Sequence, residues 1–286
     1  MVLNEMNTLR QQYHREISQR LLSVRDGVVN IADRSSESSR QISARLASKI
    51  GGPHCATPPS AQTAGALFGT INKEYLERSF RLLNRLRPGP WIFSTERSIS
   101  DFDQYRHLAE LNEILNTRRE LMATLGPDYI IKPDIVVCRI PVADEDIGVE
   151  GDTPFIATHT PLRRVNRSGD PVPILHASIS CKWTMRSDRA QNTRTEALNL
   201  IRNRKGNSPH IVAVTAEPLP MRIASLALGT GDLDCVYHFA LYELEEALDE
   251  LSHANPGVRD QHEMLQTLIE GRRLRDISDL PFDLAV

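Results

Sequence analysis

The chain has 286 residues, of which 40% are hydrophobic and 25% charged, and its formal net charge at pH 7 is −3. This supply of apolar residues is enough for one large domain or two small ones and excludes a chain that is disordered throughout. No run is apolar enough for a signal peptide or a membrane span, so we expect a cytoplasmic protein. The four cysteines are far apart and form no C-x-x-C pair, which argues against a zinc site or a disulfide framework.

The N-terminal part, residues 1–128, is predicted to be mostly helical. Apolar residues recur at helical spacing over Leu9–Leu22 and more clearly over Asn72–Leu86, and Asp101–Leu125 is predicted to be a further helix. Between the first two lies a loop, Gly51–Gly65, that is rich in Gly, Pro, Ser and Thr.

The middle part, residues 129–241, alternates apolar strands with helical segments. Its predicted strands are Tyr129–Ile140, Pro173–Trp183, His210–Ala216 and Cys235–Leu241. A helix is predicted at Asp188–Arg204, with Ser187 as its N-cap, and Val142–Pro173 is predicted to be a long excursion from the sheet.

Helices follow near Glu243–Ser252 and Gln261–Gly271 in the C-terminal part, residues 242–286. Strands that alternate with helices predict an α/β fold with a mixed central sheet sandwiched between helices. We therefore expect one domain over residues 1–286, with its α/β core at 129–241 and helical parts on both sides of it.

The charges are distributed unevenly along the chain. Residues 182–205 include seven basic and two acidic side chains, whereas residues 243–286 include eleven acidic and four basic ones. A basic segment of this kind is compatible with a polyanion as partner although the whole chain is slightly acidic. An ordinary solvated helix face would give the same count, so the charge distribution alone does not show whether the partner is a polyanion.

Three segments of the middle part carry residues that phosphodiester hydrolysis needs. Asp134 follows a proline in the first predicted strand, the S-x-K segment Ser180–Lys182 ends the second, and Glu196 lies on the next helix. A divalent metal stabilises negative charge at phosphorus and lowers the pKa of bound water. Because Mg²⁺ prefers oxygen ligands, Asp134 and Glu196 are candidate ligands, and Lys182 is a candidate to hold the attacking water or the scissile phosphate.

Taken singly, these signals are weak. A Pro-Asp pair is usually a turn, a lysine at the end of a strand is usually solvated, and a glutamate on a helix is usually a surface residue. Their order along the chain gives them more weight: a carboxylate on one strand, S-x-K on the next, and Glu196 on the helix after it.

A polar cluster at the start of that helix contains Arg186, Asp188 and Arg189. In the major groove, arginine pairs with O6 and N7 of guanine, and aspartate accepts a hydrogen bond from N4 of cytosine. Two arginines and one aspartate therefore suit a site of G and C only, and a two-fold dimer would read a palindrome. Alternatively, Asp188 only stabilises the helix start and the arginines form surface ion pairs.

Several motifs give the chain a resemblance to a known family. Ser178–Trp183, Arg186–Gln191 and Asn203–Gly206 resemble type II restriction endonucleases of the CCGG-core group, within the PD-(D/E)xK nuclease superfamily. The resemblance is dense over Leu175–Leu244, returns at Asp276–Leu280 and is thinner upstream.

The resemblance implies a restriction-endonuclease-like fold and Mg²⁺-dependent hydrolysis of double-stranded DNA. The expected site is a palindrome with a CCGG core, with GCCGGC favoured, and the expected products carry 5′-phosphate ends. It also implies a homotetramer that holds two duplexes, and a companion DNA methyltransferase in the cell.

The resemblance further implies roles for individual residues. Asp134 matches the metal-binding aspartate, Ser180 and Lys182 match the S-x-K motif, and Glu196 matches a displaced metal-binding glutamate. The main-chain carbonyl of Cys181 would be a further metal ligand.

The remaining matches concern DNA contacts. The residues that match the major-groove reader of the inner CCGG are Arg186, Asp188 and Arg189. Those that match positions at the outer G·C pair are Asp33 and Arg222, with Ser35 as a nearby candidate, and Gln62 matches a glutamine that approaches from the minor groove.

The chain departs from the family pattern at one position. The family tends to carry a glutamate on the helix after a Gln-Thr segment, but the aligned residue here is Gly69. Either this glutamate is dispensable, or Glu74 or Glu77 replaces it through a water molecule. We favour the first explanation, because two carboxylates are already available.

Two other functions remain open at this point. A repair or junction-resolving nuclease could be built on the same core, but it would recognise DNA shape and would not need the Arg-Asp-Arg cluster. A non-catalytic DNA-binding regulator would leave Lys182 and Glu196 without a role.

Overall fold

The computed structural model describes residues 2–118, 120, 130–148, 158–164, 172–185, 187–229, 231–253 and 255–286, the side chains of residues 187–189 excepted.

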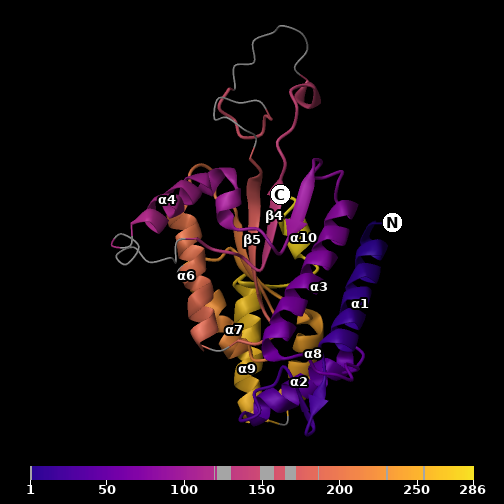
Figure 1. Ribbon diagram of the computed structural model, residues 1–286. Coiled ribbons are helices and arrows are strands. Elements are labelled where there is room, and N and C mark those ends of the chain that lie inside the picture. The colour runs from indigo at the N-terminus through magenta and orange to yellow at the C-terminus, as the bar shows by residue number, and fades with distance from the viewer. Residues whose placement is uncertain are drawn as a thin grey trace.

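A six-stranded mixed sheet forms the centre of the molecule (Figure 1). Its order is β3 (Trp91–Ser94), β4 (Ile135–Arg139), β5 (Ile174–Lys182), β6 (His210–Thr215), β7 (Cys235–His238) and β8 (Leu274–Asp276). The pairs β3–β4 and β4–β5 are antiparallel, and β5 to β8 run parallel. The predicted α/β fold with a mixed central sheet is therefore confirmed.

The sheet extends farther along the chain than we predicted. We expected all its strands within residues 129–241, but β3 comes from the N-terminal part and β8 from the C-terminal part. These two edge strands have only four and three residues, which is too short for a strand pattern to stand out in the sequence. The strand predicted at Tyr129–Ile140 begins only at Ile135, and Tyr129 itself lies outside the described residues.

The N-terminal helices are α1 (Val2–Arg20), α2 (Glu37–Lys49), α3 (Ala61–Leu82) and α4 (Arg106–Thr117). The short pair β1 (Val24–Arg25) and β2 (Val28–Val29) separates α1 from α2, and single 3₁₀ turns lie at Ile99–Asp101, Asp103–Tyr105 and Glu145–Ile147. Helix α2 was not predicted.

Helix α3 also begins well before the predicted Asn72. The hydroxyl of Ser60 accepts the N–H of Thr63 and caps the helix, so the predicted loop ends there and Gly65 is helical.

The C-terminal half contributes α6 (Ser187–Asn203), α7 (Pro220–Ala227), α8 (Leu241–Ser252), α9 (Pro256–Glu270) and α10 (Leu280–Asp283). Helix α6 includes Ser187, which we expected as its cap. None of the helices in the described ranges is both long and apolar enough to cross a membrane.

Helices cover both faces of the sheet. The Sγ atom of Cys181 accepts a hydrogen bond from Asn72 of α3 at 3.6 Å, whereas the Oγ atom of the preceding Ser180 lies 3.4 Å from Oγ1 of Thr193 of α6. Because neighbouring side chains on a strand point to opposite faces, α3 and α6 lie on opposite sides of β5. Figure 1 shows α1 beyond α3 on one side, and α6, α7 and α9 on the other.

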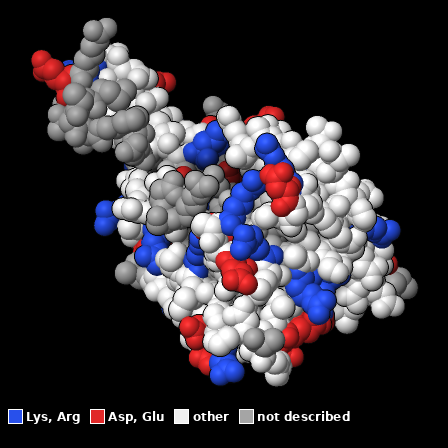
Figure 2. Space-filling view, turned by 90° about the horizontal axis from the view of Figure 1, so that it is seen from below, with Lys and Arg blue, Asp and Glu red and all other residues white. Residues whose placement is uncertain are grey.

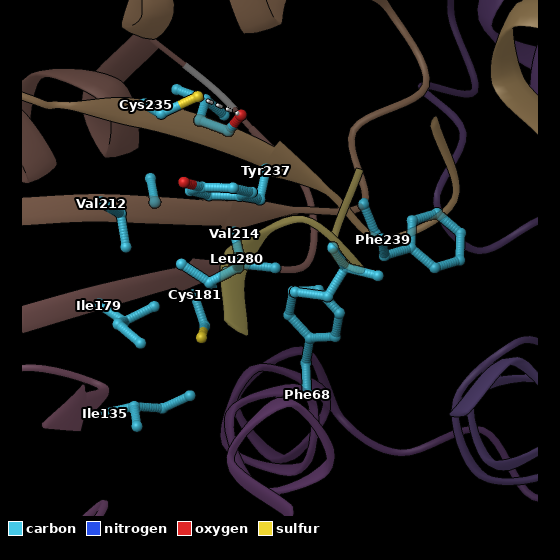
Figure 3. Close-up of a cluster of buried hydrophobic side chains, with 14 of the residues drawn as sticks. Phe68, Ile135, Ile179, Cys181, Val212, Val214, Cys235, Tyr237, Phe239 and Leu280 are labelled. Carbon is cyan, nitrogen blue, oxygen red and sulfur yellow. Dashed lines mark hydrogen bonds between the residues drawn. The ribbon is translucent and has the colours of Figure 1, made fainter. Parts of the chain in front are cut away.

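Apolar side chains from the sheet and α3 form a buried core (Figure 3). Phe68 of α3 packs among sheet residues such as Ile135, Ile179 and Val214, all of which are inaccessible to solvent. A fully buried side chain of this size stabilises the fold by about 1.5–3 kcal/mol. The core therefore holds α3 and the strands together as one unit next to the start of β4 and the end of β5.

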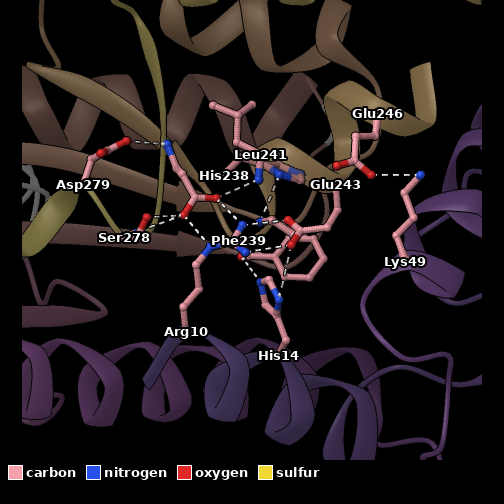
Figure 4. Close-up of polar contacts among 12 residues, drawn as sticks. Arg10, His14, Lys49, His238, Phe239, Leu241, Glu243, Glu246, Ser278 and Asp279 are labelled. Carbon is pink, nitrogen blue, oxygen red and sulfur yellow. Dashed lines mark hydrogen bonds and ion pairs between the residues drawn. The ribbon is translucent and has the colours of Figure 1, made fainter. Parts of the chain in front are cut away.

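A buried ion-pair network joins the two ends of the chain (Figure 4). Arg10 of α1 donates to both carboxylate oxygens of Glu243 at 2.7 and 2.6 Å and to both of Asp276 at 2.9 and 2.8 Å. Asp276 has no exposed surface and also accepts the N–H of Leu241. Burial opposes the ionisation of Asp276, but the hydrogen bonds and charge of Arg10 outweigh it and hold the pKa of Asp276 below its usual value.

Replacing Arg10 should therefore destabilise the protein strongly. Arg10→Met leaves Asp276 buried with an uncompensated charge, and we expect a loss of about 3–5 kcal/mol of unfolding free energy, measured by urea denaturation. The control is Arg20→Met, which breaks an exposed pair with Glu16 at 3.3 Å and should cost under about 1 kcal/mol. Equal losses in the two variants would contradict the role given to the network.

Candidate active site

The pairing of β4 with β5 determines the geometry of the site. Ile135 pairs with Ile179 in antiparallel register, so Asp134, directly before β4, lies beside the end of β5. The Oδ2 atom of Asp134 accepts the N–H of Cys181 at 2.7 Å and lies 3.2 Å from the ammonium nitrogen of Lys182. The structure therefore brings together the carboxylate and the lysine that the sequence indicated.

Ser180 and Lys182 lie on the same face of β5 because strand side chains alternate. Ser180 is buried, and its hydroxyl contacts Thr193 of α6, so it helps to seat that helix on the sheet. Lys182 is held at the strand end, where its side chain is only 19% exposed against 43% for Asp134. The carboxylate is thus the more accessible member of the pair.

Glu196 reaches the same place from α6. Burial raises the pKa of Glu196, the charge of Lys182 opposes this shift, and the charge of Asp134 adds to it. Both groups are therefore close enough to act on Glu196 electrostatically. The two carboxylates, Asp134 and Glu196, have only Lys182 as a common positive neighbour among the described residues, and a bound cation would reduce the repulsion between them.

The donor set fits Mg²⁺ better than zinc. Within the described ranges, no group of three or more His, Cys, Asp or Glu side chains could hold a metal ion. Magnesium instead takes one or two carboxylates and completes its octahedron with substrate phosphate and water. Asp134 and Glu196 supply such a pair.

Cys181 can add only its main chain to this set. Its thiol is buried on the α3 face of β5, where Sγ accepts a hydrogen bond from Asn72, so the side chain points away from Lys182. Its N–H points to Asp134. Since the N–H and C=O of one strand residue point to the same side, the Cys181 carbonyl is placed on the side of Asp134, as the family resemblance implies.

A cleft of about 1360 Å³ opens at this end of the sheet. Figure 2 looks onto this end of the molecule, where Lys and Arg side chains cross the middle of the surface with acidic groups beside them. The cleft is lined by the catalytic candidates Asp134, Cys181, Lys182 and Glu196, and by the DNA-contact candidates Asp33, Ser35, Gln62 and Arg222. The structure thus brings both sets together, although they come from both halves of the chain.

Three of the DNA-contact candidates are already hydrogen-bonded to one another. The Arg222 guanidinium donates a hydrogen bond to Asp33, and Asp33 also accepts the N–H of Ser35 at 3.0 Å and its hydroxyl at 2.6 Å. The hydrogen bonds from Ser35 and Arg222 lower the pKa of Asp33 to about 2. Asp33 is therefore ionised and oriented at neutral pH.

The predicted core reader is described only in part. Arg186 lies outside the described residues, and of Asp188 and Arg189 only the backbone, in the first turn of α6, is described. Asn192, one turn before Glu196 on the same helix, lines the cleft and was not singled out from the sequence. The start of α6 therefore lies near the cleft, while base reading by the cluster stays a prediction.

The chain resembles known proteins over nearly its whole length. Residues 13–286 match the family described as NgoMIV restriction enzyme. The chain is also 47% identical, over 270 residues and 91% of each sequence, to the type II restriction enzyme NgoMIV of Neisseria gonorrhoeae. This chain belongs to the NgoMIV restriction enzyme family. It is a type II restriction endonuclease, as predicted, and its substrate is DNA.

Family membership sets aside the repair nuclease and the non-catalytic regulator as alternatives. Among solved structures, a complex of restriction endonuclease PspGI with substrate DNA is similar at 14% identity, covering 98% of this chain and 91% of the other, with a TM-score of 0.25. At that TM-score the overlap does not bear on the fold, which is established by the sheet itself.

The departure from the family at Gly69 lies beside the main chain of Asp134. A Cβ atom at this position would lie 4.0 Å from the main-chain oxygen of Asp134. Glu77 is engaged elsewhere, because it pairs with Lys73 at 3.1 Å and Arg81 at 2.7 Å. Neither Glu74 nor Glu77 is among the described residues that line the cleft. This arrangement favours the view that the family glutamate is dispensable here.

One buried carboxylate was missed by the sequence analysis. Glu217 follows β6, its side chain is 1% exposed, and its carboxylate accepts the N–H groups of Met185 at 2.8 Å and Leu219 at 3.3 Å. Burial raises the pKa of Glu217 to about 7, against the opposing effects of these N–H groups and of Arg222. A charged residue directly after an apolar strand was the available signal.

The raised pKa of Glu217 predicts a pH dependence of stability. Because the folded state binds the proton more tightly than the unfolded chain, the stabilising contribution is full below about pH 4.5 and is lost as the pH rises through about 7. Glu217→Gln removes this titration. The unfolding free energy of the parent should therefore fall relative to that of the variant over this range, as urea denaturation at several pH values can measure. A difference that does not change with pH would refute the assignment.

Proposed function

We propose that this enzyme hydrolyses both strands of duplex DNA at a palindrome with a CCGG core, with GCCGGC favoured, using Mg²⁺ and leaving 5′-phosphate ends. One observation carries the proposal: Asp134, Lys182 and Glu196 line the same cleft as Asp33 and Arg222. A cleft that holds hydrolytic groups beside polar groups suited to base edges fits cleavage at a recognised sequence.

In the proposed mechanism, Asp134, Glu196 and the carbonyl of Cys181 would hold Mg²⁺. When bound, the ion acts as a Lewis acid and lowers the pKa of bound water. Lys182, oriented by Asp134, donates a hydrogen bond to the attacking water or to the scissile phosphate. The water oxygen attacks phosphorus and the bond to the 3′-oxygen breaks, which leaves a 5′-phosphate and a 3′-hydroxyl. Ser180 supports the site through its contact with α6.

Base reading is divided between two groups of residues. We assign the inner CCGG to Arg186, Asp188 and Arg189, because arginine suits guanine and aspartate suits the amino group of cytosine. The residues assigned to the outer pair are Asp33, Ser35 and Arg222, and Gln62 is assigned to the minor groove. The position of these last four in the cleft supports the assignment.

We further propose a homotetramer that holds two duplexes in the cytoplasm, in a cell that carries a companion methyltransferase. The acidic C-terminal part supplies part of the contact surface, although some of it is already used within the chain. Lys49 of α2 pairs with Glu246 at 3.0 Å and with Glu250 at 2.8 Å of α8. Light scattering should give a tetramer with DNA, and two-site plasmids should be cut faster than one-site plasmids. A monomer in the presence of DNA would exclude this assembly.

Removing a catalytic carboxylate should separate cleavage from binding. Asp134→Ala should abolish cleavage with Mg²⁺ and leave specific DNA binding measurable, and Lys182→Ala should slow cleavage by roughly a hundredfold or more. Plasmid digestion and gel-shift binding measure the two properties. Glu77→Gln, on α3 and not among the described residues that line the cleft, is the control and should cleave like the parent. Near-parental cleavage by Asp134→Ala would overturn the assignment.

The core reader can be tested by competition between DNA sequences. Arg186→Lys loses the planar fork that pairs with guanine, so cognate binding should weaken by about 1–3 kcal/mol per contacted base pair. Asp188→Asn places a donor opposite the cytosine amino group and should reduce cognate affinity while random DNA binds slightly better. Competition with cognate and core-scrambled duplexes measures both effects. Equal losses on the two duplexes would mean that these residues contact only the backbone.

A further inference from the structure

Glu217 has no part in the chemistry described so far, yet it contacts Arg222, a proposed reader of the outer pair, and Met185, which directly precedes the proposed core reader in the sequence. It sits just after β6, and each of its two carboxylate oxygens faces a different segment. The Oε2 atom accepts the N–H of Met185 at 2.8 Å, whereas Oε1 lies 3.8 Å from the Arg222 guanidinium and accepts the N–H of Leu219 at 3.3 Å. One buried side chain therefore touches both the approach to α6 and the start of α7.

The contact with Glu217 anchors Met185, the residue that precedes the core reader in the sequence. Met185 is buried and directly precedes Arg186, where the chain passes from β5 into α6. The same region is held from β6, because the hydroxyl of Thr215 donates to the carbonyl oxygen of Lys182 at 3.0 Å. The end of β5 and the segment after it are thus anchored at two points, by Thr215 at the end of β6 and by Glu217 just after it.

The contact with Arg222 restrains the outer reader. The Arg222 guanidinium lies between two carboxylates, with Asp33 on the open side and Glu217 on the buried side. Asp33 is accessible and lines the cleft, whereas Glu217 is almost fully enclosed. When DNA takes over one of the hydrogen bonds of Arg222, Glu217 is the partner that remains within the protein.

We propose that Glu217 is a positioning residue that couples reading of the outer base pair by Arg222 to reading of the CCGG core by residues 186–189. This inference rests on the reader assignments of the proposed function. Residues that share one rigid partner are energetically coupled, so a wrong outer pair, which leaves Arg222 misplaced, also disturbs the segment that begins at Met185. The enzyme would then reject a near-cognate site more strongly than separate readers would.

Above its pKa of about 7, Glu217 is ionised and both of its oxygens accept, and the coupling requires this carboxylate form. A glutamine of nearly the same size offers one acceptor and one donor. Its amide would face either the Met185 N–H or the Arg222 cation, and both of those groups are donors. Glu217→Gln therefore keeps the volume of the buried side chain but breaks one of the two links.

The test measures dissociation constants for four duplexes without metal, so that no DNA is cut, and at a pH well above 7, where Glu217 is ionised. These are the cognate site, a site with the outer pair changed, a site with one core pair changed, and a site with both changed. The penalty of a change is the factor by which it raises the dissociation constant relative to the cognate duplex. For the parent, the penalty of the double change should differ from the product of the two single penalties by about fivefold or more. For Glu217→Gln, it should equal that product within about twofold.

The matched control is Glu243→Gln. Glu243 also pairs with an arginine in a largely buried site, but its ion-pair partners in the described part of the chain are Arg10 and His14, and neither belongs to a reader segment. This variant should lower the thermal midpoint and keep the parental non-additivity. If Glu217→Gln also keeps the parental non-additivity of the two base-pair changes, the inference is wrong. Should Glu217→Gln fail to fold, Glu217→Asp, which withdraws the carboxylate by one methylene, is measured with the same duplexes and judged by the same criterion.

Arg222→Ala distinguishes failure of the inference from failure of the proposed function. If this variant keeps the full preference for the outer pair, Arg222 is not its reader and the assignment under the proposed function fails. If Arg222→Ala loses the preference while Glu217→Gln leaves the coupling intact, only the inference about Glu217 fails.

Discussion

The site depends on the antiparallel pairing of β4 with β5. This register places Asp134, just before one strand, against the main chain of Cys181 and the ammonium of Lys182 at the end of the other. A slip of one residue would turn Lys182 to the opposite face of the sheet. The buried residues on both strands oppose such a slip, and the chain that leaves β5 then has to return through α6, which brings Glu196 to the same end of the sheet.

The helical parts outside the central core do more than cover it. The loop with Asp33 and the start of α3 with Gln62 form one wall of the cleft, while Arg222 comes from the other half of the chain. The contact of Arg10 with Asp276 spans 266 residues of sequence and holds α1 against the C-terminal strand. The division into a catalytic core and helical flanks stays a prediction, but the flanks contribute directly to the proposed DNA-binding surface.

Much of the site could be predicted because its residues follow local rules. The strands β5, β6 and β7 are apolar runs, and the S-x-K spacing places Ser180 and Lys182 on one face. What escaped prediction depends on contacts distant in sequence or on very short elements. The strands β3 and β8 are too short for a pattern, and the start of α3 is set by one serine in a Pro/Gly-rich loop. A charged residue after an apolar strand draws attention to Glu217, but its contact with the N–H of Met185 follows only from the fold.

Cleavage of a random-sequence DNA library tests the central claim most directly. The protein is incubated with the library and Mg²⁺, and both ends of every product are sequenced and their phosphorylation is determined. Because the two arginines and one aspartate of residues 186–189 are suited to G and C alone, all ends should derive from a palindrome with a CCGG core and carry 5′-phosphates, with G·C as the outer pair. Ends without a shared CCGG core would contradict the account.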